Sequence, residues 1–576
     1  MNKNIYIMKA KKTMKTKLSS FILHSSFFVS LLSLTSCSDF LDILPMNDVV
    51  LENYWTQKAD VTSVMNSCYE ALENGDCMAR LAVWGELRSD NVRAGANVPN
   101  AINEILKENL LPTNDYCNWS KVYECINRCN TVCHYAPEVQ AIDPNYTYDE
   151  MQANIAEATT LRALCYFYLI RTFRDVPYTT EPSIDDTQNY VIAATKFDDV
   201  IDKLIEDLRG VEDFAVRRYY VDDSPNAYYN SSKITRWAVY ALLADLYLWK
   251  GDWDMCIAYC DKVIDFKKQQ YEEMIERKGN VNNIALIDGI PMILEKPIGS
   301  TNCGNSYTEI FGEGNSFESI FELYFNSRQS QQNKWVNDYY GGTNTTGRLS
   351  CPDFLAKDVA TGTNTVFKRT DGRIYESAQS NNSSYIITKY VRSRVSYSTQ
   401  SVTSESSLNL VQSRRSSSDA NWIFYRLSDV ILAKAEALIE RNEEGDLDAA
   451  FALIDIINKR ANDAVNGQRS STLKRSEYDT KASMEQLVLE ERQKEFLFEG
   501  KRWFDLVRFA RRDGNNKRLV ELVARKYIDN VNAIKIKLAD PNIIYFPYAK
   551  SELKVNPLLK QNPAFTNDET SELTTK

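Results

Sequence analysis

The chain has 576 residues, of which 44% are hydrophobic and 25% charged, an ordinary globular composition that suits several domains or one large helical assembly. Twenty Gly and fifteen Pro are few for this length, which argues against a turn-rich, all-β architecture. The formal net charge of −10 argues against a nucleic-acid partner, because binding to phosphates needs a basic surface.

The N-terminal segment has the pattern of a secretory signal. A basic stretch begins at Met14, and the apolar run after it is shorter than the ~20 residues that span a bilayer. We therefore expect a signal peptide over residues 1–36, with Met14 as an alternative start. The sequence Leu34-Thr-Ser-Cys37 fits a bacterial lipobox, so we expect lipidation at Cys37 and a tether over residues 37–52. The alternative is a signal that ends in an incidental cysteine.

Helical patterns dominate the first half of the chain. We expect a helix over residues 53–80, a loop over 81–100 and a further helix over 119–133. Residues 157–174 are apolar on nearly every face, which predicts a fully buried helix, and Pro177 follows its end. A shorter amphipathic helix is expected over 198–208.

Two segments fit the helix-pair template of tetratricopeptide repeats, in which small residues allow close approach and aromatics fill the space between helices. The first covers residues 243–263 and the second, a looser copy, covers 425–457. Such pairs cannot bury their faces alone, so we expect them to stack into an array. Between them, residues 296–420 are polar and Ser-rich, and we expect a short strand over 385–391 paired with 394–397.

The cysteines predict buried thiols more than disulfides. Cys125, Cys129 and Cys133 are four residues apart, so they share a helix face and are badly placed to bridge one another. A metal site that adds His134 is the alternative. Structural zinc sites usually collect cysteine pairs from separate turns, so we expect no metal and no cofactor.

Residues 490–508 predict one long helix that Gly500 interrupts. Apolar residues recur on one face, and charges of both signs line the other. A glycine inside a helix costs about 1 kcal/mol, so Gly500 either permits close packing or ends a turn. Taken alone, these residues are explained by an amphipathic helix that has no catalytic or binding role.

The wording of this stretch nevertheless resembles the signature of the SusD/RagB family, helical lipoproteins that cap a TonB-dependent transporter in the outer membrane of Bacteroidetes. Four more segments match family motifs in the right order: the lipobox, the buried helix that ends in Phe173-Arg-Asp-Val-Pro177, the stretch from Tyr425 to Leu438, and the C-terminal segment from Tyr545 to Phe565. In the second motif, Arg174 stands where the family usually has Gly.

The resemblance implies a mainly α, tetratricopeptide-like array of helical hairpins with long loop insertions and a few short β-strands. It divides the chain into an N-terminal part, 53–295, and a C-terminal part, 296–576, which should form one compact unit with a loop-rich ligand region at 296–420. It implies no enzyme, but a lid over a SusC-like transporter that is anchored by lipid in the outer membrane and captures an oligosaccharide. Peptide capture and, less favoured, a helical glycoside hydrolase with two carboxylates ~5–9.5 Å apart are the alternatives.

Chemistry and location select the candidate ligand residues, because sugar binding uses aromatic rings for stacking and polar groups for the hydroxyls. The stretch from Trp335 to Gly342 is the best of them, since aromatics beside glycine in a polar loop are hard to explain as core. The alternative is that these rings pack under their own loop. The candidates are Asn91, Arg93, Tyr307, Trp335, Asn337, Tyr339 and Tyr340.

Overall fold

Helices form most of the computed structural model, which describes residues 54–184, 190–222, 224–279, 281, 283–294, 305–326, 331–382, 384–397, 410–466 and 471–568. The described residues from Gln57 onward cluster into one compact unit. The predicted signal peptide, Cys37 and the tether lie outside the described residues.

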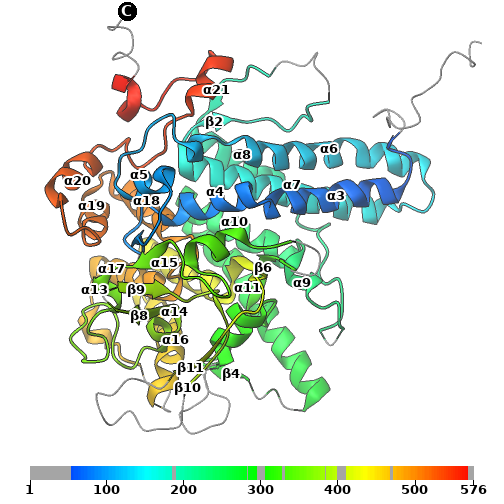
Figure 1. Cartoon of the computed structure of the whole chain (residues 1–576). Helices are drawn as coiled ribbons and strands as arrows, with labels where there is room; N and C mark the ends of the chain where they lie inside the picture. Colours follow the sequence, from blue (N-terminus) through cyan, green and yellow to red (C-terminus); the bar gives the residue numbers. More distant parts are fainter. Residues whose placement is uncertain are drawn as a thin grey trace, which may run out of the picture. The chain divides into compact units, whose positions relative to one another are not determined.

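Four helices of the N-terminal part pack together: the first two follow each other in one row, and the other two lie beside them (Figure 1). A capping box between Thr147 and Glu150 starts α7, and almost every residue from Ala156 to its end is buried, which confirms the predicted buried helix. The predicted helix over 53–80 is two helices, separated at Asn74, and the second extends into the predicted loop. These helices are α3 (Lys58–Glu73), α4 (Gly75–Glu86), α6 (Ser120–Ile142) and α7 (Tyr148–Phe173).

The end of α7 is a strained turn. Arg174 has φ 72° and ψ −75°, and the amide of Asp175 donates to the carbonyl oxygen of Phe173 at 3.1 Å. This is the geometry of a γ-turn with positive φ, which is rare for a residue with a side chain. The conformation explains why a glycine is favoured at this position.

The two predicted helix pairs are present and pack on each other. Gly251 ends α10 in the left-handed conformation and Asn442 ends α15 in the same way. The helices α11 and α15 pack together, which joins the first pair to the second. The pairs are α10 (Arg236–Lys250) with α11 (Trp253–Lys278), and α15 (Leu427–Arg441) with α16 (Asp446–Asn466).

The strands are short and pair mostly with distant segments. The predicted pairing of 385–391 with 394–397 is wrong. The strand β9 (Ser384–Ile387) lies between β7 (Leu349–Cys351) and β8 (Ala378–Asn381) in the sheet β1-β7-β9-β8. The other pairs are β10 (Arg392–Tyr397) with β11 (Leu410–Arg414), β12 (Trp422–Arg426) with β6 (Ser319–Leu323), β2 (Val176–Pro177) with β3 (Ala194–Thr195), and β4 (Ile284–Ile287) with β5 (Ile290–Ile293).

The signature stretch, residues 490–508, is not one helix. α17 (Lys481–Glu495) ends before a turn in which Phe498 and Gly500 both have positive φ, and α18 (Arg502–Asp513) begins after it. A Cβ atom on Gly500 would lie 2.7 Å from the ring of Trp422. Gly500 therefore both ends a turn and permits close packing, the two roles that its position suggested.

Shorter elements complete the fold around these helices. They are β1 (Arg93–Ala94), α5 (Asn100–Leu106), η2 (Asp115–Cys117), α8 (Phe197–Val211), α9 (Tyr229–Ser232), α12 (Asn305–Tyr307), η3 (Thr308–Glu313), η5 (Val336–Tyr340), α13 (Asp353–Ala356), α14 (Gly372–Ser377), η6 (Arg475–Glu477), α19 (Lys517–Ala524), α20 (Val531–Leu538), α21 (Lys550–Val555) and η7 (Pro563–Asp568).

Candidate functional site

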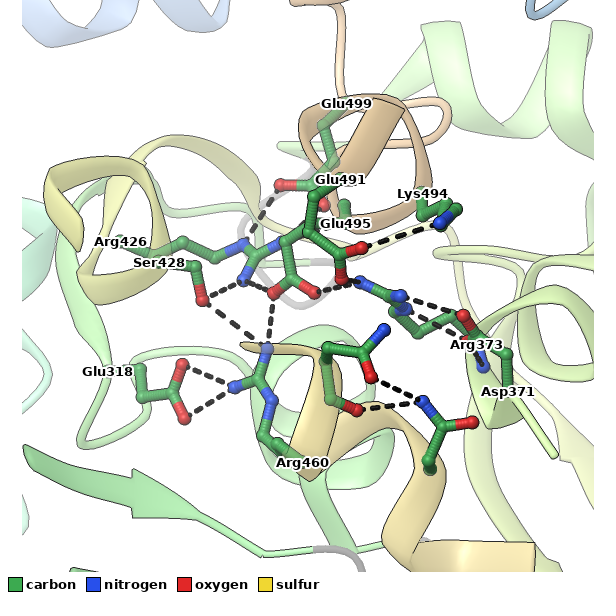
Figure 2. Close-up of polar contacts among 12 residues, drawn as sticks. Glu318, Asp371, Arg373, Arg426, Ser428, Arg460, Glu491, Lys494, Glu495 and Glu499 are labelled. Carbon is green, nitrogen blue, oxygen red and sulfur yellow. Dashed lines mark hydrogen bonds and ion pairs between the residues drawn. The ribbon is translucent and has the colours of Figure 1, made fainter. Parts of the chain in front are cut away.

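Most charged side chains of the signature stretch, residues 490–508, are buried in a network of ion pairs, part of which Figure 2 shows. Glu495 accepts hydrogen bonds from Arg426 Nη1 at 2.6 Å and Arg373 Nη1 at 3.0 Å, and from Arg460. We expected these charges on a face opposite to the apolar one. Both faces of the stretch are buried, and the charges form a second, polar core.

The same network ties the loop-rich region 296–420 to the helices. Glu499 accepts hydrogen bonds from Lys389 Nζ at 2.6 Å and from Arg426 Nη2 at 2.9 Å. Burial alone would raise the pKa of Glu499, but Arg426 and Lys389 outweigh burial and lower the pKa to about 2. Because Lys389 and Arg373 belong to the loop-rich region, these ion pairs fix that region against α15 and α17.

The signature stretch also holds the segment that contains Asn91. Arg502 Nε donates to Asp90 Oδ1 at 2.8 Å, and Gln493 Nε2 donates to Asn91 Oδ1 at 3.0 Å. Asn91 is fully buried. Its side chain therefore supports the loop that leads to Arg93 and does not face a ligand.

The predicted aromatic stretch packs against the same turn. The rings of Trp335 and Tyr339 stack with centroids 4.3 Å apart, and the hydroxyl of Tyr340 donates to the carbonyl oxygen of Phe498 at 3.1 Å. Trp335 and Tyr340 are each 1% exposed. Both rings thus pack under their own loop, the alternative considered from the sequence.

An accessible surface forms where β1 pairs with β7. The antiparallel register places Arg93 opposite Ser350, and the amide of Gly95 donates to the carbonyl oxygen of Arg348 at 2.8 Å. The amide of Arg348 donates to the carbonyl oxygen of Asp338 at 3.3 Å. This pairing brings the segments around Arg93, Arg348 and Tyr339 to one edge of the molecule, although they are distant in sequence.

The side chains at this edge combine rings with guanidinium groups. Arg93 Nη2 donates to Asp353 Oδ1 at 2.6 Å, and the guanidinium carbon of Arg348 lies 5.8 Å from the ring centre of Tyr339. Burial and a hydrogen bond with the Tyr339 hydroxyl raise the pKa of Tyr116, which is half-buried. We define the β1–β7 platform as Arg93, Tyr116, Asn337, Tyr339 and Arg348.

The platform contains three of the seven candidate ligand residues, Arg93, Asn337 and Tyr339. Tyr307 lies apart from it: Tyr307 is buried, and its hydroxyl donates to the carbonyl oxygen of Thr388 at 3.0 Å. Together with Asn91, Trp335 and Tyr340, Tyr307 offers no exposed face to a ligand in this structure. Tyr339 belongs to the platform but is itself only 9% exposed, because its ring stacks on Trp335. We therefore expect direct ligand contact from Arg93 and Asn337 among the seven candidates.

Sequence reasoning missed Tyr116 and Arg348. Arg348 follows Gly347, where a Cβ atom would lie 2.2 Å from the carbonyl oxygen of Tyr339. A glycine that permits so close an approach is a signal that the sequence does contain. Nothing local indicates that Tyr116 meets Tyr339.

Comparison with known proteins places this chain among relatives along most of its length. The model described as the SusD family matches residues 324–565, and one described as starch-binding associating with outer membrane matches residues 39–248. The chain belongs to the SusD family. The predicted resemblance is thereby confirmed.

The chain is also similar to a SusD-like protein in sequence and to solved SusD-like structures in fold. SusD-like protein P38 from Formosa agariphila is 25% identical over 487 residues, which are 83% of this chain and 89% of that protein. A SusD superfamily structure from Bacteroides thetaiotaomicron has a TM-score of 0.62 at 19% identity and covers 89% of this chain and 99% of that one. A laminarin binding SusD-like protein has a TM-score of 0.59 at 18% identity and covers 88% and 99%. These structures confirm the helical, tetratricopeptide-like fold.

The described cysteines of this SusD-family chain are free thiols, and all but Cys133 are buried. Cys125 and Cys129 lie at the interface of α6 with its neighbours, where small apolar side chains pack well. Among the described residues, no group of three or more His, Cys, Asp or Glu side chains is arranged to hold a metal ion. No helix in that part of the chain is both long and apolar enough to cross a membrane.

Proposed function

We propose that this SusD-like protein is a lipoprotein of the cell surface that captures a nutrient oligosaccharide and delivers it, as a lid, to a SusC-like TonB-dependent transporter in the outer membrane. One family match is described as starch-binding, and one structural neighbour is a laminarin binding SusD-like protein; both support a carbohydrate ligand. The protein itself carries out no chemistry on the sugar in this proposal.

One observation carries the assignment of a ligand surface: the pairing of β1 with β7 gathers Arg93, Arg348 and the half-buried Tyr116 at one edge, above the buried ring of Tyr339. Guanidinium groups supply several hydrogen-bond donors for hydroxyls, and tyrosine rings offer apolar faces with a polar tip. Contacts of this kind give a modest affinity for each sugar, which many copies on one surface would compensate.

The decisive experiment is calorimetric titration of starch-derived and laminarin-derived oligosaccharides into the wild type and into R93A and R348A. We expect each substitution to weaken binding about tenfold, which corresponds to about 1.4 kcal/mol. R475A is the matched control, because Arg475 pairs with the exposed Asp448 on α16. Unchanged affinity in both platform variants would remove the platform from the ligand site.

The alternatives have their own readouts. Binding to a peptide library without binding to a glycan array would replace the proposed ligand class. Release of reducing ends from polysaccharides would indicate a hydrolase.

Anchoring and partnership are tested separately from ligand binding. We expect radiolabelled palmitate to be incorporated into the wild type and not into C37S, which should leave the membrane fraction. The transporter should co-purify with the wild type from detergent-solubilised outer membranes. Recovery of C37S in the membrane with its label would overturn the assigned anchor.

A further inference from the structure

A stack of four tyrosines lies on the surface far from the β1–β7 platform in sequence. Tyr220 stacks on Tyr229 with centroids 5.6 Å apart, Tyr229 lies 4.3 Å from Tyr228, and Tyr228 stacks on Tyr324 at 4.8 Å. Tyr220 is 40% exposed and the other three are half-buried. We call Tyr220, Tyr229, Tyr228 and Tyr324 the tyrosine stack.

The stack is held in place by Asn230. Its side-chain nitrogen donates to the carbonyl oxygen of Tyr220 at 2.7 Å, and its side-chain oxygen accepts from the amides of Tyr219 and Tyr220 at 2.8 and 3.0 Å. The backbone of both tyrosines is thus fixed against α9. A row of rings fixed in this way loses little conformational freedom when a flat apolar ligand covers it.

A cavity of about 160 Å³ opens beside the stack, and Ala227, Asn230 and Ser231, which flank two of its tyrosines, contribute to the wall. Thr235, at the start of α10, also lines the cavity; it is 1% exposed, and its hydroxyl has no hydrogen-bond partner among the described residues. Trp237 supplies an apolar part of the wall. An unpaired buried hydroxyl costs free energy that a polar ligand in the cavity would recover.

The charged residues that line the cavity are mostly positive: they are three cations, Arg217, Arg218 and Lys267, and one carboxylate, Asp222. Two of its ionic residues already have partners: Asp222 lies 3.7 Å from Arg277, and Arg218 lies 3.1 Å from Glu273.

The two remaining cations, Arg217 and Lys267, form no ion pair with a carboxylate in the part of the chain that the structure describes. Lys267 is only 4% exposed, and its ammonium group donates its three hydrogen bonds to the carbonyl oxygens of Phe317 and Ser319 and to Gln270 Oε1.

Asp222 and Glu318 act on Lys267, but each of them is paired with an arginine, Arg277 and Arg460. The cavity therefore keeps an excess of positive charge, which favours an anionic ligand.

We propose that this cavity binds one acidic sugar unit, a hexuronate or a sulfated hexose, whose anionic group pairs with Arg217 beside the positive charge of Lys267, while the neighbouring units lie along the tyrosine stack. Thr235 would bond the sugar hydroxyls, as polar groups in ligand pockets do. This second site is separate from the β1–β7 platform, and neither requires the other.

The titration of Lys267 supports the proposal. Burial lowers the pKa of Lys267 to about 8, although Asp222 and Glu318 act to raise it. The ammonium form is therefore present below pH 8 and is lost above it. Affinity for an acidic sugar should fall as the pH rises from 7 to 9, whereas affinity for a neutral sugar should not change.

The test compares trigalacturonate, the neutral trisaccharide of the same linkage, and galactose 6-sulfate in calorimetric titrations at pH 7. We expect the wild type to bind trigalacturonate or the sulfated sugar at least tenfold more tightly than the neutral trisaccharide; the two acidic probes separate a carboxylate from a sulfate. R217Q and T235V should each weaken acidic binding at least fivefold. K267M should do the same, and its unfolding curve shows whether it folds.

Two variants serve as controls. K203Q removes an exposed positive charge from α8, and R475A removes one that pairs with the exposed Asp448; both should leave binding of the acidic probe unchanged. Equal binding of acidic and neutral probes, no binding of either acidic probe, or unchanged affinity in R217Q and T235V would each overturn the proposal. Loss of acidic binding in R93A alone would assign the acidic sugar to the platform and reject the cavity.

Discussion

Removal of the charge of Glu499 should destabilise the protein through the buried network that joins the loop-rich region to the helices. The pKa of this carboxyl falls from an ordinary value of 4.5 to about 2 in the folded protein. One pKa unit corresponds to about 1.4 kcal/mol, so the charged form is favoured over the neutral form by about 3 kcal/mol. Glutamine has nearly the shape of the neutral form, and E499Q should therefore lower the free energy of unfolding by about 3 kcal/mol.

The assay is unfolding in urea, followed by circular dichroism and by tryptophan fluorescence. E521Q is the matched control, because Glu521 also lies 2.6 Å from a lysine, Lys535, but at an exposed site. An exposed pair is worth at most about 1 kcal/mol, so E521Q should change little. The double variant E499Q/K389M should lose less than the sum of its single substitutions, because K389M removes the cation that E499Q leaves unpaired.

The contribution of Glu499 to the free energy of unfolding should change with pH in one direction. The folded-state pKa of Glu499 is lowered, so its contribution is complete above pH 4.5 and is lost as the pH falls toward 2. The difference in stability between wild type and E499Q should therefore shrink as the pH is lowered below 4.5. The reasoning fails if E499Q costs no more than E521Q at pH 7, or if the difference does not depend on pH.

Three further substitutions or treatments test single features. G500A should cost about 2–4 kcal/mol, because its Cβ would lie 2.7 Å from Trp422 in addition to the unfavourable φ, whereas G445A, with positive φ and open space, should cost about 1 kcal/mol in urea unfolding. Equal costs would show that the contact with Trp422 is unimportant. R174G should raise stability by about 1 kcal/mol by relieving the γ-turn, and a loss would refute that strain. Alkylation of the native protein, mapped by peptide mass spectrometry, should modify Cys133 before the buried described thiols, and early labelling of those thiols would contradict their burial.

The helices of this fold follow closely from local sequence. The apolar pattern of residues 157–174 predicts a buried helix, and most of α7 is buried. The template at 243–263 falls on α10 and α11, where side-chain spacing alone determines which faces meet. Helical hydrogen bonds are local, so the pattern that predicts them is contained within each segment.

Pairings between distant segments could not be predicted in this way. The partner of β10 begins at Leu410 and the partner of β1 begins at Leu349, so local alternation does not identify either. The turn at Gly500 also depends on a residue that is distant in sequence, because the ring of Trp422 in β12 packs against it. A single sequence shows which residues alternate as in a strand, but it does not show which other strand pairs with them.

The candidate site was predictable in part. Of the candidates chosen as polar and aromatic loop residues, Arg93 and Asn337 lie at the platform with partly exposed side chains, and their contact with a ligand stays a prediction. Trp335 and Tyr340 have the same local surroundings in sequence, yet their rings cover the signature turn. Composition cannot separate a ring that faces solvent from one that fills the space beneath its own loop.

The buried ion pairs explain why the loops of the region 296–420 need not be flexible. Replacing a buried ion pair by apolar groups is often neutral or stabilising, so stability by itself does not account for the network. Its geometry suggests a different role: if the loop-rich region shifted, Arg373 would separate from Glu495 and leave buried charges without partners. The same turn receives the hydroxyl of Tyr340 and, through Arg502, holds Asp90. We infer that the network selects one position for the two segments that form the platform, so that the proposed binding surface and the helical array would move as one body, as the proposed lid function would require.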